Sequence, residues 1–408
     1  MEPWRRNLYA VWVSQIFSLM GFGFVIPFLP FYIQELGVTD PNEVRYWSGL
    51  VAAAPALTMG LMAPVWGLIA DRFGRKLMLL RAMLSGAIII AMMSFARSVE
   101  GVLALRALQG ALTGTVAASG ALVATSTPAH KLSYALGLQA SSNFIGISLG
   151  PFAGGLAGEF LGYRSSFLFG AAILMVGFFV VLRNIEERPV PEEKPKGAID
   201  AGSGGGSPAF RVTRSVVGLF ALIFLMRFLM TMIIPFLPLY VQQIRGSIEG
   251  SAMVAGSLSG LTAAATAAAG LTVVRLGDRT GPARLSAVLA LAGAVLSLPI
   301  FWIHALLPFG ALLTAASYFY GGITPLIQSA LTVRVSAARR GLLFGVLTMV
   351  GNAGWFLAPL VGSAIAIHLS INHIFLLFAA ILLIAAVIAG LVGAANEEKK
   401  SVSLRETS

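Results

Sequence analysis

Long apolar stretches recur along the whole chain and are separated by short polar breaks. A transmembrane helix needs roughly 20 mostly apolar residues, and lipid cannot satisfy backbone groups that a helix leaves open. The pattern therefore predicts an all-α integral membrane protein with twelve transmembrane helices. We expect these helices near residues 8–35, 46–70, 77–96, 99–124, 132–158, 163–182, 215–243, 250–274, 283–303, 306–332, 341–367 and 371–395.

One polar break is much longer than the others. Residues 183–214 are first charged, then rich in proline, and finally rich in glycine and serine. This is the composition of a flexible hydrophilic linker. It lies near the midpoint of the chain, so we predict an N-terminal six-helix half at 1–182, a C-terminal six-helix half at 215–395 and a tail at 396–408.

Composition supports a membrane protein, because 57% of the residues are hydrophobic and 11% are charged, against about 25% charged in soluble domains. The net charge of +11 follows from topology. If the N-terminus is cytoplasmic, most Lys and Arg fall in cytoplasmic segments, and the opposite side receives only Arg45, Arg97, Arg164 and Arg245. The positive-inside rule then predicts a multi-pass protein of the cell inner (cytoplasmic) membrane with both termini cytoplasmic. Nucleic acid is not an expected partner.

The two halves repeat each other. Residues 26–36 and 234–244 are identical at seven of eleven positions, at an offset of 208. The sequence Asp71-Arg72-Phe73-Gly74 is repeated as Asp278-Arg279-Thr280-Gly281, and Gly150-Pro151 as Ala358-Pro359. Parallel repeats of this kind place a substrate site between the halves near the bilayer midplane. We therefore expect alternating access by rocking of one pseudo-symmetric bundle against the other.

The loop after the second helix, residues 67–76, reads GLIADRFGRK and resembles motif A of the major facilitator superfamily, a resemblance that extends over nearly the whole chain. It implies that the Asp lies at the cytoplasmic ends of helices and that the basic residues hold the two halves together. The alternative is a positively charged turn that only sets topology. The candidate residues are Gly67, Asp71, Arg72, Gly74, Arg75 and Lys76, with Asp278 and Arg279 in the reduced second copy.

The fourth predicted helix carries Arg106, Gln109 and Gly110, which are similar to motif B of the drug-exporting branch. A charge in mid-membrane is costly and indicates function. The resemblance links this Arg to proton coupling or to the substrate cavity. The alternative is a structural Arg that bonds to backbone carbonyl groups.

The fifth predicted helix resembles motif C, the antiporter motif, at Gly146, Gly150, Pro151, Gly154 and Gly155. We expect its glycines, spaced four apart, to form a flat strip against a helix of the other half. The resemblance implies export rather than uptake by a symporter. Together with residues 71–81 and Trp47-Ser48-Gly49, the motifs are most similar to the twelve-helix drug:proton antiporter branch and its MdtG-type multidrug exporters.

No carboxylate lies at the centre of a predicted helix, which departs from several members of that branch. The candidate proton carriers are therefore Glu35, Asp71 and Asp278. Arg106 and Arg227 are two mid-membrane cations, so we predict a cavity that favours anionic or zwitterionic amphiphiles. The other candidate cavity residues, each with helix packing as its alternative, are Gln15, Phe24, Gln139, Asn143, Gln328, Asn352 and Trp355.

These features predict a monomeric secondary transporter that exports small amphiphilic molecules, as in multidrug efflux, by proton antiport. An exporter dedicated to one natural compound, such as a siderophore or a lipid-like metabolite, has the same motifs and stays open as an alternative. A membrane enzyme is disfavoured by the four scattered His residues and the missing central carboxylate. No cofactor or metal is expected beyond the proton gradient.

Overall fold

The computed structural model describes residues 2–187, 214–273, 276–277, 280–334 and 340–406. In this part of the chain, 11 helices are long and apolar enough to cross a membrane. A further pair of helices, bent by 41° at a short break, makes 12 when it is counted as one span. The prediction of a twelve-helix, all-α membrane fold is confirmed. Most of the predicted linker lies outside the described residues.

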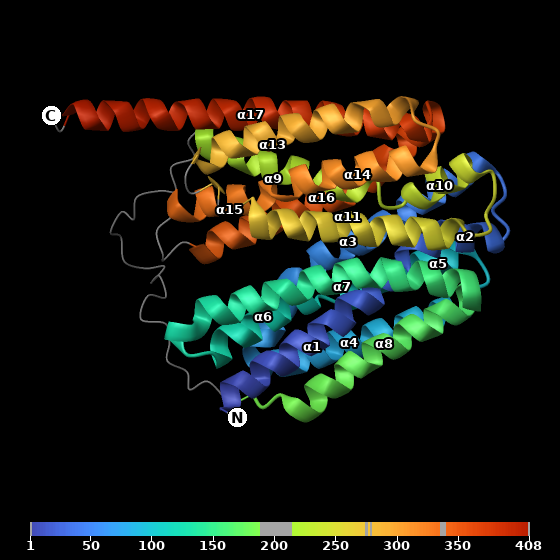
Figure 1. Cartoon of the computed structure of the whole chain (residues 1–408). Helices are drawn as coiled ribbons and strands as arrows, with labels where there is room; N and C mark the ends of the chain where they lie inside the picture. Colours follow the sequence, from blue (N-terminus) through green and yellow to red (C-terminus); the bar gives the residue numbers. More distant parts are fainter. Residues whose placement is uncertain (1, 188–213, 274–275, 278–279, 335–339, 407–408) are drawn as a thin grey trace.

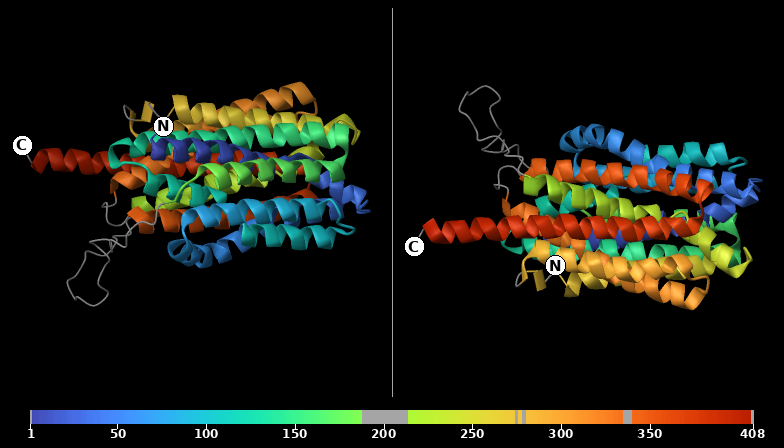
Figure 2. Two further views of the ribbon diagram at one scale, coloured as in Figure 1. Left: turned by 90° about the horizontal axis from the view of Figure 1, so that it is seen from below. Right: turned by 90° about the horizontal axis from the view of Figure 1, so that it is seen from above.

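The helices form two groups that lie side by side, and both chain ends lie at the same end of the bundle (Figures 1 and 2). The first group consists of α1 (Pro3–Phe24), η1 (Ile26–Phe28), α2 (Leu29–Glu35), α3 (Pro41–Phe73), α4 (Arg75–Met93), α5 (Val99–Leu112), α6 (Thr115–Ser126), η2 (Ala129–Lys131), α7 (Leu132–Leu161) and α8 (Tyr163–Asn184). The second group consists of α9 (Arg214–Met232), α10 (Leu237–Arg245), α11 (Ser251–Thr272), α13 (Pro282–Ser297), η3 (Leu298–Trp302), α14 (Leu306–Gly321), α15 (Ile323–Arg334), α16 (Arg340–His368) and α17 (Ile371–Glu406).

The sequence repeat appears in the structure as helix breaks at matching positions. The first and seventh spans break after Phe24 and Met232, where prolines interrupt the backbone hydrogen bonding. The fourth and tenth spans break before Thr115 and Ile323. Each pair of positions is 208 residues apart. Broken helices in corresponding places of two halves are the structural sign of a transporter binding site.

The break between α5 and α6 is stabilised by neighbouring helices. Trp66 on α3 donates from Nε1 to the carbonyl oxygen of Ala111 at 2.6 Å, and the Ser85 hydroxyl on α4 donates to that of Leu112 at 3.0 Å. The last carbonyl groups of a helix have no partner within it. The two side chains therefore satisfy backbone groups that lipid could not.

The cores of the two halves repeat as well. Tyr32 packs against Phe167, with ring centroids 4.8 Å apart, and donates to the carbonyl oxygen of Met93 at 2.8 Å. The matching Tyr240 packs against Phe375 at 5.0 Å and donates to the carbonyl oxygen of Ile303 at 2.7 Å. Each buried hydroxyl thus has a partner, as a phenol in an apolar core requires.

The halves contact each other along two interfaces, α7 with α11 and α3 with α16. We call the end of the bundle away from both termini the distal end; α2 and α10 lie there (Figure 1). The inter-half hydrogen bonds lie near this end. Gln34 and Gln242, again 208 residues apart, exchange amide hydrogen bonds at 3.1 and 3.3 Å.

Toward the end that carries the termini, the same helices diverge. A Cβ atom on Gly60 of α3 would lie 3.8 Å from Asn352 Nδ2 on α16, and one on Gly270 of α11 would lie 3.9 Å from Phe144 on α7. At Gly67, farther along α3, no heavy atom of the described residues lies within 4 Å of that position. The two halves are therefore closed at the distal end and separate toward the termini.

Candidate functional site

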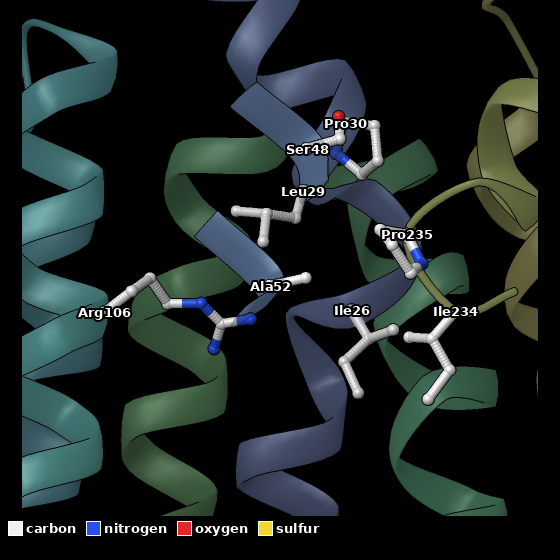
Figure 3. Close-up of a pocket in the computed structure, with 8 residues that line it drawn as sticks. All are labelled: Ile26, Leu29, Pro30, Ser48, Ala52, Arg106, Ile234 and Pro235. Atoms are coloured by element: carbon white, nitrogen blue, oxygen red, sulfur yellow. The ribbon is translucent and has the colours of Figure 1, made fainter. Parts of the chain in front are cut away.

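A small cavity lies where the breaks of the first and seventh spans face each other across the two halves. Its volume is about 20 Å³, enough for about one water molecule. Arg106 lies at one wall, with the connection between α9 and α10 opposite (Figure 3). The lining residues are Ile26, Leu29, Pro30, Ser48, Ala52, Arg106, Ile234 and Pro235.

Arg106 is the charged residue of this cavity and is only 8% exposed. Its guanidinium donates to Gln109 Oε1 at 2.9 Å, while its Nε has no hydrogen-bond partner among the described residues. Gly110 packs directly against Pro55, which brings α5 close to α3. A buried cation without a carboxylate is expensive, so this Arg is suited to bind an anionic group.

Arg227 is the second predicted cation, and it lies on α9 in the other half. Its side chain is exposed, and it makes no hydrogen bond or ion pair with a residue in the described part of the chain. A Cβ atom added to Gly351 of α16 would lie 3.4 Å from the Cγ atom of Arg227, so the glycine provides room for the long side chain. Asn352 follows on α16 and faces α3 of the first half.

The glycines of α7 make two different contacts. Gly146, Gly150 and Gly154 pack against α1 of the same half, so our expectation that this strip faces the other half is wrong. Gly155 instead faces α11, where a Cβ would lie 2.9 Å from the Cα of Gly256. Residues four apart share one helix face, whereas the next residue is turned by about 100°. One motif therefore joins α7 to both halves.

A second copy of this pattern occurs in α16, which the sequence reasoning missed beyond the Ala358-Pro359 pair. Gly354 and Gly362 pack against α9, and Ser363 takes the place of Gly155 at the inter-half contact. There a Cβ on Gly49 of α3 would lie 2.6 Å from the Cβ of Ser363. Extending the offset of 208 along α16 is the signal that could have found it.

The sequence model of the Major Facilitator Superfamily matches residues 11–313 and 219–407. The chain belongs to the Major Facilitator Superfamily. Multidrug resistance protein MdtG of Escherichia coli (strain K12 / DH10B) is 32% identical over 386 residues, which are 94% of this chain and 93% of MdtG. The predicted similarity to the MdtG-type exporters of the superfamily is thus confirmed.

Two solved structures show the same fold. An inward-facing, occupied bacterial homologue of the human lysosomal transporter Spinster superposes with a TM-score of 0.76 at 16% identity, covering 97% of this chain and 98% of its own. The human organic anion transporter MFSD10 superposes with a TM-score of 0.70 at 20% identity, covering 95% of this chain and 100% of its own. Both describe the arrangement of helices in this superfamily.

Motif A of this superfamily member contacts its own half. The backbone N–H groups of Arg75 and Lys76 donate to Glu187 at 2.7 and 2.8 Å, and Lys76 Nζ donates to the carbonyl oxygen of Ile185 at 2.6 Å. Gly74 has a φ of +89°, and a Cβ there would lie 2.7 Å from the Glu187 carboxylate. This part of motif A therefore binds the chain after α8, within the same half.

The predicted proton carriers lie in different places. Glu35 is paired with Arg164 at 3.1 Å, at the distal end. Asp71 belongs to the last turn of α3, but its side chain lies outside the described part, as do Asp278 and Arg279. The described residues contain no cluster of His, Asp and Glu that could hold a metal ion.

The amides predicted for the cavity are divided between interior and interface. Gln15 is 0% exposed and Gln139 donates to Ser119 at 2.8 Å, so both lie inside the first half. Phe24 is buried beside Phe28 and Phe169 and serves packing there. The remaining candidates are half-buried: Asn143 on α7, Gln328 on α15, and Asn352 and Trp355 on α16.

Proposed function

We propose that the protein exports small amphiphilic compounds in exchange for protons, with anionic or zwitterionic compounds preferred. The similarity to Multidrug resistance protein MdtG over 94% of the chain supports a multidrug transporter. Contacts at the distal end and separation toward the termini support alternating access. If the basic end of the bundle is cytoplasmic, this conformation faces the cytoplasm, the state in which an exporter loads its substrate.

Arg106 is the observation that carries the substrate preference. It is a buried cation beside the interface of the halves, with one nitrogen unpaired and an amide as its hydrogen-bond partner. An amide leaves the positive charge uncompensated, so an anionic group of the substrate gains more there than a cationic one. Arg227 adds a second positive charge from the opposite half.

The proposal includes the setting of the protein. It is a monomer in the inner membrane, with both termini in the cytoplasm and the distal end outside. Glu35, Asp71 and Asp278 remain the proton carriers proposed from the sequence. Export of one dedicated metabolite is the second candidate, and a substrate panel distinguishes it from multidrug export because only one compound would then be transported.

The test measures uptake into proteoliposomes for matched anionic, zwitterionic and cationic amphiphiles. We expect the anionic and zwitterionic compounds to be transported best, and Arg227→Gln to lower their uptake by about 5- to 150-fold, from the roughly 1–3 kcal/mol of a charge-assisted contact. Arg97→Gln, a matched change at an exposed arginine of a distal loop, should leave uptake unaltered. A wild-type preference for cations that Arg227→Gln does not affect would contradict the proposal.

A further inference from the structure

Glu159 joins the two halves at the distal end. It lies in the last turn of α7, and both of its carboxylate oxygens accept from the backbone N–H of Gly250, at 2.9 and 2.8 Å. Gly250 is the residue that precedes α11, with a φ of +74°. The contact therefore connects the first half to the first turn of a helix in the second.

The chemistry of this contact depends on charge. Gly250, the N-cap of α11, has no side chain that could cap the helix, and the Glu159 carboxylate is the acceptor for the backbone N–H of this N-cap residue. A helix N-terminus carries a partial positive charge that favours an anion. The ionised carboxylate is therefore the form that stabilises contact between α7 and α11, while a neutral carboxylic acid offers a weaker acceptor and no charge.

The contacts beside it cannot respond to protons in this way. Gln34 and Gln242 exchange amide hydrogen bonds. On the second interface, Ser363 donates to the carbonyl oxygen of Arg45 at 3.0 Å, and the Arg45 guanidinium donates to that of Ala366 at 2.9 Å. None of these groups changes its charge between acid and neutral pH.

Other charged or titratable groups face the same region. On α8, Tyr163 lies close enough to interact electrostatically with both Glu159 and Glu35. Glu35 is neutralised by its ion pair with Arg164. In the loop before α11, the Arg245 guanidinium lies against Gly250, and the side chain of Glu249 is exposed. The first three turns of α11 carry no charged side chain.

We propose that Glu159 makes closure of the distal end depend on pH on that side of the membrane. The ionised form holds α7 to α11, and protonation from the distal aqueous phase weakens the contact and favours opening toward that phase. In an antiporter, acid outside would thereby expose the path from which protons enter. The inference rests on the proposed function only for the assignment of the distal end to the outside.

The experiment uses the full chain, which contains no cysteine. Spin labels on Ser165→Cys and Leu307→Cys mark the distal ends of the two halves, at exposed positions on α8 and α14. Distance distributions in lipid nanodiscs are recorded from about pH 8 down to about pH 3, so that the range extends below the ordinary pKa of a glutamate side chain of about 4.3, without substrate. We expect a short distance at pH 8 and a long-distance population that grows about tenfold on acidification, the size expected for a charge-assisted hydrogen bond.

Glu159→Gln should populate the long distance at every pH, and Glu159→Asp, which keeps the charge, should retain a pH response. Glu249→Gln is the matched control in the adjacent loop and should behave as wild type. A Glu159→Gln protein that keeps the wild-type pH response, or that stays closed throughout, would overturn the inference. Because the assay needs no substrate and no gradient, failure of proton-coupled export in liposomes would be a separate result.

Discussion

The two interfaces between the halves have the same helix geometry but different chemistry. Gly155 on α7 meets Gly256 on α11, and the matching Ser363 on α16 meets Gly49 on α3. At the first interface the backbones are in direct contact, and the Glu159 carboxylate accepts a hydrogen bond across it. At the second interface the Ser363 hydroxyl and the Arg45 guanidinium donate hydrogen bonds across it. A repeated fold thus gives two interfaces, of which one can respond to protons and the other remains constant.

Gly256→Ala should have the largest effect on this comparison. The added Cβ would lie 2.8 Å from the Cα of Gly155 and even closer to the carbonyl oxygen of Pro151, and both are backbone atoms. Overpacking of this kind costs about 1–3 kcal/mol, so the distal end should open. The measurement is the distance between labels at Ser165→Cys and Leu307→Cys.

Gly120→Ala on α6 is the matched control, because no heavy atom lies within 4 Å of its added Cβ. It should leave the distances as in wild type. If Gly256→Ala also left the distal end closed, close contact between α7 and α11 would not be what holds the halves together there.

Ser363→Gly should have the next largest effect, since it makes the second interface resemble the first. The change removes the hydroxyl that donates to the carbonyl oxygen of Arg45 at 3.0 Å. We expect a loss of about 1 kcal/mol in the closed state, at every pH, while the pH response stays as in wild type. Distance distributions at about pH 3 and pH 8 check this. A response that disappeared in Ser363→Gly would show that the second interface also senses protons.

Much of the fold followed from the sequence for physical reasons. Apolar segments of spanning length predict helices, because a bilayer permits few other structures. The offset of 208 residues predicted the repeat, and a mid-membrane cation pointed to Arg106, which the structure places beside the interface cavity. For the helices and for Arg106, the cost of placing polar groups in lipid leaves few alternatives.

Other features depend on which way a helix is turned, and periodicity does not give that direction. The strip of Gly146, Gly150 and Gly154 was expected to face the other half and instead packs on α1. Gln15 and Gln139 were expected in the cavity and lie inside the first half. Nothing in the sequence singles out Glu159, since its partner is a backbone N–H 91 residues away, and a backbone group leaves no signature in the sequence.

The proposed function requires that the protein exchange an amphiphilic anion for protons across the membrane. The most direct measurement is accumulation of such an anion in proteoliposomes under an imposed pH gradient, with proton movement followed by a pH-sensitive dye inside the vesicles. We expect accumulation to rise with the gradient and protons to move in the opposite direction to the substrate. Accumulation that is the same with and without the gradient would contradict the proposed function.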